Sequence, residues 1–273
     1  MKRKILPLVC GILLLSATPV QAYEYETKQI AWDEDWEYAS YSEIHGDDVT
    51  LYQVSEDAKT VSVNAGHGTV GGTEYSTLCH PDGTPKVTGG STAEGAVYAT
   101  AIAVGTTMLD GTAEAEVTLS LAEIVRDQLL EAGYNVLMIR ENMDTQLDNI
   151  ARTVFSNQNA NCHIALHYDS TEYDKGLYYM SVPMVDSYLS MEPVASHWEE
   201  HTKLGESLIA GCEEEGIAIF ESGSLAMDLT QTSYSTVPTV DVEVGDRGSD
   251  YSRETQEKIA AGLVKGIEKF FES

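Results

Sequence analysis

The stretch VTLSLAEIVRDQLLEAGYNVLMI, residues 117–139, decides the fold. Its large apolar residues recur at helical spacing from Val117 to Leu129 and stop before Gly133, a residue typical of a helix C-terminus. The apolar run YNVLMI at 134–139 follows directly and indicates a strand. The stretch therefore predicts a helix that leads through a short turn into a strand.

The same alternation continues on both sides of this stretch. Strands are expected from Thr60, in TVSVNAG, and at 162–167, 176–182 and 237–244; further helices are expected from Leu147 to Phe155, at 197–214, and from Ile259 to Phe270. Strands interleaved with helices in this way predict an α/β fold. We expect a central, largely parallel twisted sheet with helices on both faces.

The chain is strongly acidic. Its 273 residues include 16 Lys and Arg against 44 Asp and Glu, a formal charge of -28. Such a chain is repelled by nucleic acid and by anionic lipid headgroups, so neither is an expected partner. With 42% hydrophobic and 22% charged residues, the composition is that of a globular protein.

The N-terminus has the pattern of a secretory signal peptide, residues 1–22. Basic residues at 2–4 precede an apolar stretch at 5–15 and a small-residue cleavage site at 20–22. The apolar stretch is shorter than the roughly 20 residues of a membrane-spanning helix, and no later segment is apolar enough to span. Cleavage leaves 273 − 22 = 251 residues with a formal charge of 13 − 44 = -31. We expect a secreted protein of the cell envelope, extracellular or periplasmic.

Two regions follow the predicted signal, and the second contains a long loop. Residues 23–58 hold eleven acids, five Tyr and two Trp, and are too short for a core of their own. They either lay aromatic side chains over the main domain or are partly disordered. The main domain is expected at 59–273, and within it residues 69–113, rich in Gly, Thr and Ser, are expected to form an elaborated loop that borders the site.

Three cysteines, Cys79, Cys162 and Cys212, follow the predicted signal, with no CxxC spacing. An odd number excludes a full disulfide framework. One disulfide with a free thiol and three buried thiols are both open.

Four polar side chains lie where predicted strands or helices end, which is where sites form in open α/β sheets. They are His67 in NAGHG, Glu114 in GTAEAEVTL, His167 in IALHYDS and Glu243 in VDVEVG. Two imidazoles and a carboxylate are the ligand set of a catalytic Zn²⁺. Glu243 is then the candidate for proton transfer, since apolar neighbours raise the pKa of a carboxyl. No short metal motif is present, so scattered structural histidines and a buried, paired Glu are the open alternative.

Other polar residues have simpler expected roles. His163 is expected to be structural or to lie at the rim of the site, and Asp241 shares a strand face with Glu243, where it either raises the pKa of Glu243 or accepts a hydrogen bond. Arg140 and Arg152 are expected to tie loops to acidic partners, with substrate anchoring as the alternative role of Arg152. Surface positions are expected for the histidines at 45, 80, 197 and 201.

Taken in order, the motifs VSVNAGHG, EAEVTLSLA, LLEAGYNVLMIRENMD, LDNIARTVFSNQNANCHIALHYDS and VPTVDVEVG resemble the zinc-dependent N-acetylmuramoyl-L-alanine amidases, which cut bacterial peptidoglycan. The resemblance covers residues 60–273. It implies that His67, Glu114 and His167 bind one Zn²⁺ and that Glu243 is the catalytic acid and base.

Register within the resemblance selects one of two glutamates. The family Glu lies five residues before a helix Leu; counted back from Leu119, that residue is Glu114, with Glu116 as the alternative. The chain departs from the family at Asp169, where Asn is usual, at Ala165, where Ser is usual, and in the DRGSD that follows VEVG. These changes fall on the expected substrate-facing rim.

The resemblance implies hydrolysis of the amide between N-acetylmuramic acid and L-alanine, with peptidoglycan muropeptides as substrates. Two alternatives differ in product. A zinc peptidase or carboxypeptidase would shorten the stem peptides, and a catalytically weak peptidoglycan-binding protein would release nothing.

Overall fold

The computed structural model describes residues 24–273, so the predicted signal peptide at 1–22 lies outside the described part. Its centre is an eight-stranded sheet with the strand order β1-β2-β6-β3-β7-β10-β8-β9. The four inner strands β6, β3, β7 and β10 run parallel, which confirms the expected largely parallel sheet. The strands of this sheet are β1 (Glu26–Ile30), β2 (Val49–Gln53), β3 (Thr60–Ala65), β6 (Asn135–Met138), β7 (Cys162–Asp169), β8 (Leu177–Ser181), β9 (Ile219–Ala226) and β10 (Thr239–Asp246).

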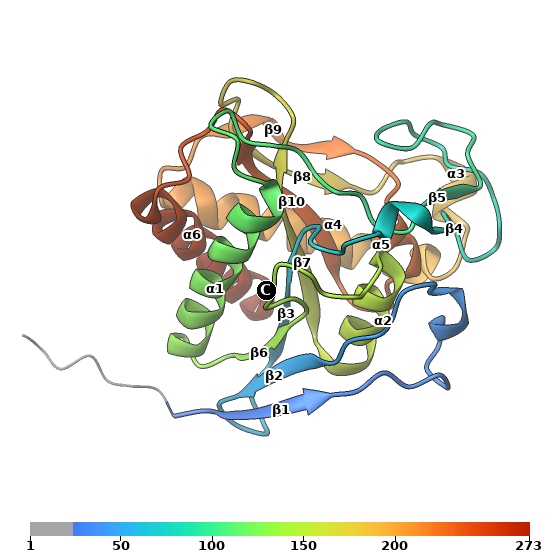
Figure 1. Ribbon diagram of the computed structural model, residues 1–273. Helices are drawn as coiled ribbons and strands as arrows, with labels where there is room; N and C mark the ends of the chain where they lie inside the picture. The colour runs from blue at the N-terminus through green and yellow to red at the C-terminus, as the bar shows by residue number, and fades with distance from the viewer. Residues whose placement is uncertain (1–23) are drawn as a thin grey trace, which may run out of the picture.

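Helices cover both faces of the sheet, as expected. In Figure 1, α1 and α6 lie on one side of the strands and α2 on the other. Side chains of α1, α4 and α6 share one apolar core with alternate residues of the inner strands, including Val61, Val63, Val240 and Val242. The helices are α1 (Glu114–Glu131), α2 (Asn149–Asn159), α3 (Asp186–Leu189), α4 (Val194–Glu214), α5 (Thr230–Tyr234) and α6 (Arg253–Glu272), with short 3-10 helices at Ala39–Tyr41 and Gly72–Glu74.

Local chemistry sets where the helices begin and end. Beyond the end of α1, Gly133 has φ 88°, a left-handed conformation that glycine adopts without steric cost. Asp148 caps α2 by accepting a hydrogen bond from the Ala151 amide at 2.8 Å. Ser252 caps α6 in the same way, so this helix begins six residues before Ile259, where the apolar pattern starts.

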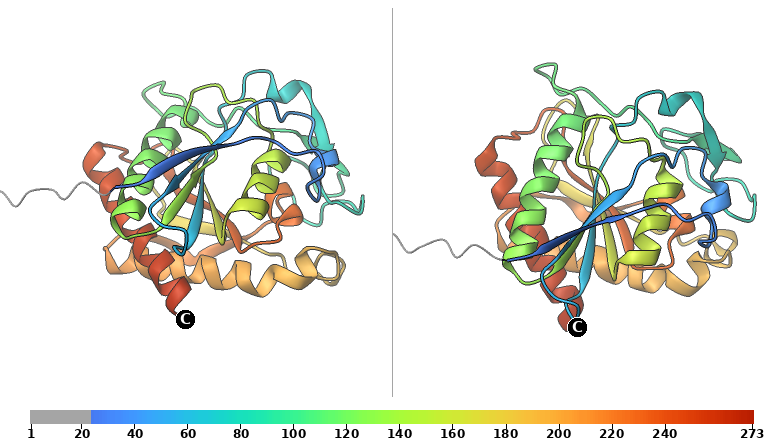
Figure 2. Two further views of the ribbon diagram at one scale, coloured as in Figure 1. Left: turned by 90° about the horizontal axis from the view of Figure 1, so that it is seen from below. Right: turned by 60° about the horizontal axis from the view of Figure 1, so that its bottom comes forward.

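The N-terminal part of the chain extends the sheet at one edge. Strand β1 pairs antiparallel with β2, and β2 pairs antiparallel with β6. Seen from below in Figure 2, both strands lie along the front of the sheet. Between them, the Trp32 and Trp36 rings each contact Phe155 at 5.4 Å between centroids, so aromatic side chains of this region do lie over the main domain.

Residues 69–113 form a long excursion between β3 and α1, which we call the 69–113 segment. Its only strands, β4 (Ser76–Leu78) and β5 (Tyr98–Thr100), form a small separate hairpin. The distant Asp228 holds the segment: it pairs with Lys86 and lies 3.2 Å from His80 Nε2. The 69–113 segment is therefore an elaborated loop, as expected, and Asp228 anchors it to the main domain.

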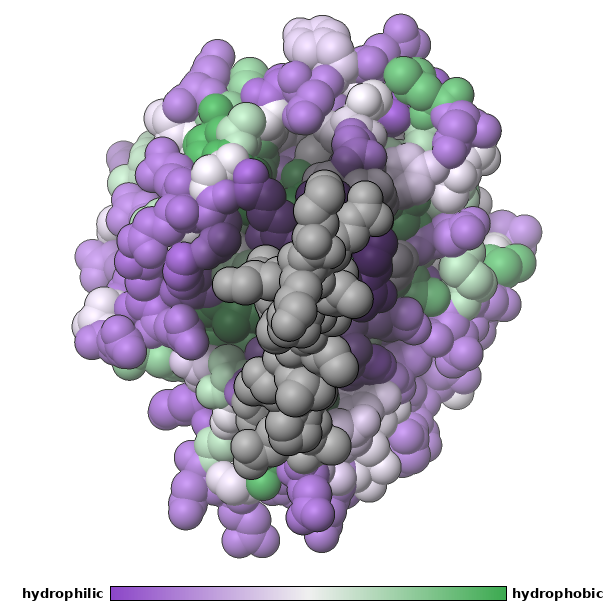
Figure 3. Space-filling view, turned by 90° about the vertical axis from the view of Figure 1, so that its left-hand side faces the viewer, coloured by the Kyte–Doolittle hydropathy of each residue, from purple (hydrophilic) through white to green (hydrophobic). Residues whose placement is uncertain are grey.

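The surface of the molecule agrees with its acidic composition. The face covered by α1 and α6 is largely hydrophilic where it is visible in Figure 3, as the acidic composition leads one to expect. Among the helices described, none combines the length and the apolar character needed to cross a membrane.

Cys79, Cys162 and Cys212 are free and buried, so the three-thiol alternative is confirmed.

Candidate metal centre and cleft

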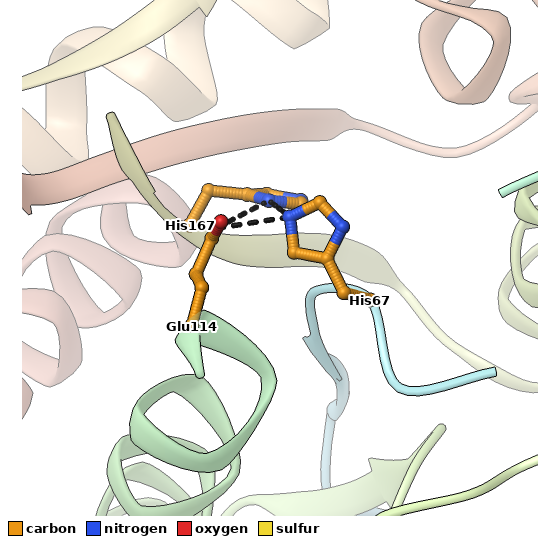
Figure 4. A group of neighbouring side chains, drawn as sticks. All are labelled: His67, Glu114 and His167. Atoms are coloured by element: carbon orange, nitrogen blue, oxygen red, sulfur yellow. Dashed lines mark hydrogen bonds and ion pairs between the residues drawn. The ribbon is translucent and has the colours of Figure 1, made fainter. Parts of the chain in front are cut away.

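Three of the predicted site residues meet at one point. His67 lies in the turn after β3, Glu114 is the first residue of α1, and His167 lies on β7. His67 Nε2 is 3.0 Å from Glu114 Oε1 and 3.1 Å from His167 Nδ1, and His167 Nδ1 is 3.3 Å from Glu114 Oε1 (Figure 4). One donor atom from each residue lies within 4.8 Å of the others, which is a spacing that can hold a metal ion.

Two glycines make this convergence possible. A Cβ atom on Gly66 would lie 2.4 Å from Cε1 of His167. A Cβ atom on Gly105 would lie 2.6 Å from Cδ2 of His67 and 2.8 Å from Oε2 of Glu114. Backbone packs so closely against the three side chains that only glycine fits at either position.

Backbone groups orient the donor atoms. His67 Nδ1 lies 2.8 Å from the Ala103 carbonyl oxygen, an acceptor, so the ring proton sits on Nδ1 and the lone pair of Nε2 faces the centre. Glu114 Oε2 accepts from the Thr106 amide at 2.7 Å, and Oε1 accepts from the Tyr168 amide at 3.0 Å. The N-terminus of α1 also favours a carboxylate at Glu114.

The electrostatics favour a cation at the centre. Burial opposes ionisation of Glu114, but the close His167 and His67 rings outweigh it and hold the pKa of this carboxyl well below its usual range. Burial by itself would lower the pKa of His167, yet Glu114, Asp241 and Glu243 raise it to about 9. Two imidazoles and an ionised carboxylate are also the donor set of a tetrahedral zinc site with one open position, so the residues fit that metal.

The centre lies in a cleft of about 820 Å³. Glu243, on β10, lines the cleft and is paired in register with His167 across the sheet. Burial raises the pKa of Glu243 to about 8, an effect that the nearby His167 opposes. Residues 99, 100 and 102–106 of the 69–113 segment also line the cleft, which confirms that this segment borders the site.

The structure also settles the lesser expectations. Glu116 is exposed on α1, so Glu114 is the glutamate that reaches the centre. His163 is fully buried on β7 and does not belong to the group of three. His45 and His197 are partly exposed. The surface prediction was wrong for His80 and His201, each only 1% exposed, because they contact Asp228 and the Thr239 amide.

The predicted acidic partners of Arg140 and Arg152 were also wrong. Both side chains are buried and donate mainly to backbone carbonyls, including Ala65 O from each. Arg152 also donates to the His67 carbonyl at 2.7 Å. Carbonyls at the end of β3 can accept from a buried guanidinium, and no sequence pattern reveals which ones are free to do so.

Sequence reasoning missed two polar features of the cleft. Tyr178, on β8, donates to Asp169 Oδ2 at 2.7 Å, and Lys175 pairs with the same carboxylate, so the Asp that replaces the usual Asn has a cation beside it. Gln231 lines the cleft from α5 and is only 5% exposed. The departure from the family at Asp169 was a signal for the first feature; the second had none.

Comparison with known proteins finds one matching family and several solved structures with a similar fold. The sequence model of the N-acetylmuramoyl-L-alanine amidase family matches residues 61–269. The solved N-acetylmuramyl-L-alanine amidase Ami1 of Mycobacterium smegmatis is similar with a TM-score of 0.64 at 18% identity, over 80% of this chain and 99% of that one. Ami1 from Mycobacterium abscessus gives 0.61 at 20% identity, over 78% and 98% of the two chains. For the amidase AmiC2 of Nostoc punctiforme the values are 0.56 and 17%, over 79% and 98%. At such identities these structures show a shared fold alone. No curated protein sequence matches the chain significantly.

Proposed function

The chain belongs to the N-acetylmuramoyl-L-alanine amidase family and is a peptidoglycan amidase, and we propose that it works with one Zn²⁺ held by His67, Glu114 and His167. The observation that carries the proposal is the convergence of these three donors in a cleft that Glu243 also lines. The catalytic domain is proposed at 59–273.

Zinc bound at the three donors would act as a Lewis acid, which polarises a carbonyl and makes water a better nucleophile near neutral pH. The chain supplies the remaining steps. His67 and Glu114 stay fixed by backbone hydrogen bonds, so little reorganisation is needed. Glu243 takes the proton of the water that attacks the lactyl carbonyl. The same carboxyl then gives that proton to the L-alanine nitrogen as the amide bond breaks.

Mass analysis of the products of purified peptidoglycan tests the reaction. The proposal expects free stem peptides that begin with the amino group of L-alanine. Shortened stems that remain attached to the glycan would identify a peptidase instead, and no release would identify a binding protein. Zinc dependence is tested on the same substrate by chelation followed by metal addition.

We also propose that the chain is exported to the cell envelope and that residues 1–22 are removed, since the substrate of the family lies outside the cytoplasmic membrane. The basic, apolar and small-residue pattern of these residues supports this. N-terminal sequencing of protein from the culture medium or envelope should begin at Tyr23; an intact Met1 on the cell-associated enzyme would refute cleavage.

A further inference from the structure

Each of the three donor residues has one polar atom that faces away from the centre, and not all of these atoms make a hydrogen bond. His67 Nδ1 bonds to the Ala103 carbonyl, and Glu114 Oε2 accepts from the Thr106 amide. His167 differs: its Nδ1 faces the centre, and its Nε2 faces Asp241 Oδ2 across 3.7 Å, which is longer than a hydrogen bond.

Asp241 is the residue that faces His167 Nε2. It lies on β10 two residues before Glu243 and is only 7% exposed. Its Oδ1 has no hydrogen-bond partner among residues 24–273. A buried carboxylate oxygen without a hydrogen bond is costly, so the presence of Asp241 beside His167 needs a reason.

We infer that Asp241 is a positioning residue for the metal centre, and that it holds His167 in the tautomer and orientation that bind the ion. The inference rests on the metal site proposed above. When a cation takes the lone pair of Nδ1, the proton of a neutral imidazole must sit on Nε2. That N–H points at Asp241, and closing the 3.7 Å gap by less than 1 Å makes a charge-assisted hydrogen bond. Metal-binding histidines are generally held in this way from behind.

Zinc affinity, measured by competition with a chelator on residues 23–273, tests the inference. Asp241→Leu should bind zinc roughly 10- to 100-fold more weakly than wild type. Asp241→Asn should fall between the two, because its amide oxygen still accepts a hydrogen bond.

Asp246→Asn is the matched control. Asp246 is a fully buried aspartate of the same strand, and its Oδ1 also lacks a hydrogen bond, but its side chain faces Lys175. Its replacement should leave zinc affinity unchanged even where it lowers stability. If Asp246→Asn lost as much zinc affinity as Asp241→Asn, the loss would be a general effect of disturbing β10, and the inference would be overturned.

A spectroscopic measurement gives a second, independent result. In protein with labelled histidine rings, zinc should produce a slowly exchanging Nε2–H signal for His167 in wild type, and this signal should exchange faster in Asp241→Leu. Unchanged zinc affinity and proton exchange in Asp241→Leu would overturn the role of Asp241 alone. A wild-type chain that binds no zinc would overturn the proposed metal centre and this inference together.

Discussion

At the scale of single residues, the two glutamates of the cleft are held in opposite ways. Glu114 accepts two backbone hydrogen bonds and faces two imidazoles, whereas Glu243 Oε2 has no hydrogen-bond partner among the described residues. A carboxylate that accepts hydrogen bonds stays ionised and can therefore bind a cation. An enclosed one with a pKa of about 8 can exchange a proton near neutral pH.

Glu243→Gln should therefore separate catalysis from metal binding. An amide cannot take a proton from the attacking water, and general acid-base catalysis is typically worth on the order of 10² to 10⁴ in rate. Turnover of a muramoyl-peptide should fall by at least that factor while zinc content and folding stay nearly intact. Both are measured on one preparation. Loss of zinc would make Glu243 a ligand and reopen the role of Glu114.

Gly105→Ala should damage the metal centre without touching a ligand. The new Cβ would lie 2.6 Å from His67 Cδ2 and 2.8 Å from Glu114 Oε2, so at least one donor must move. We expect zinc affinity to fall at least tenfold, measured by chelator competition. Gly111→Ala is the matched control, because Gly111 also has a positive φ but nothing lies within 4 Å of its Cβ position. If both variants lost affinity equally, backbone strain and not the clash would be the cause.

At the scale of elements, the 69–113 segment depends on one buried anchor. Asp228 is fully buried; it pairs with Lys86 Nζ at 2.8 Å and accepts from the Val87 amide at 2.6 Å, and His80 Nε2 lies 3.2 Å from it. Ala103 and Thr106 of the same segment orient His67 and Glu114, so the anchor and the metal centre share one stretch of chain.

The anchor predicts a specific pH dependence of stability. Burial opposes ionisation of Asp228, but its contacts with His80, Lys86 and Thr88 outweigh burial and hold the pKa of the carboxyl far below its usual value. A pKa that is lower in the folded state contributes stability above the unfolded value of about 3.9 and loses it as pH falls further. Asp228→Asn should therefore be about 2–4 kcal/mol less stable than wild type at pH 7, and the difference should shrink below pH 4 in urea unfolding. The exposed Asp186→Asn should show neither effect; a gap independent of pH would contradict the ionised anchor.

The sequence predicted the elements that carry the site but not the contacts that hold it. Apolar periodicity located α1, β7 and β10 because each packs an apolar face into the core. Strand β9 was not predicted, since IFESGSLA has no alternation and its side chains are largely exposed at the sheet edge. The burial of His80 depends on Asp228, 148 residues further along the chain, and local sequence carries no such information.

At the scale of the whole molecule, the proposed ion would link parts of the chain that are far apart in sequence. Glu114 follows His67 by 47 residues and precedes His167 by 53, and the three belong to a turn, a helix and a strand. The apolar core between the sheet and α1, α4 and α6 contains none of them. The fold should therefore persist without metal, and the ion should add stability to a structure that is already formed.

Zinc titration of the whole chain checks this expectation. The purified protein should hold about one Zn²⁺ per molecule, and saturation at 100 times the dissociation constant should add about 2.7 kcal/mol to the free energy of unfolding. His67→Ala, His167→Ala and Glu114→Ala should lose both the ion and the added stability. Glu116→Ala, a change at an exposed glutamate of the same helix, should keep both. Because a formal charge of -28 attracts divalent cations to the surface, the measurement belongs in about 0.15 M salt, where exposed charges are screened. Stoichiometric zinc that survives replacement of either histidine would show that the ion binds elsewhere, and a metal-free chain that is unfolded would show that the core cannot form without it.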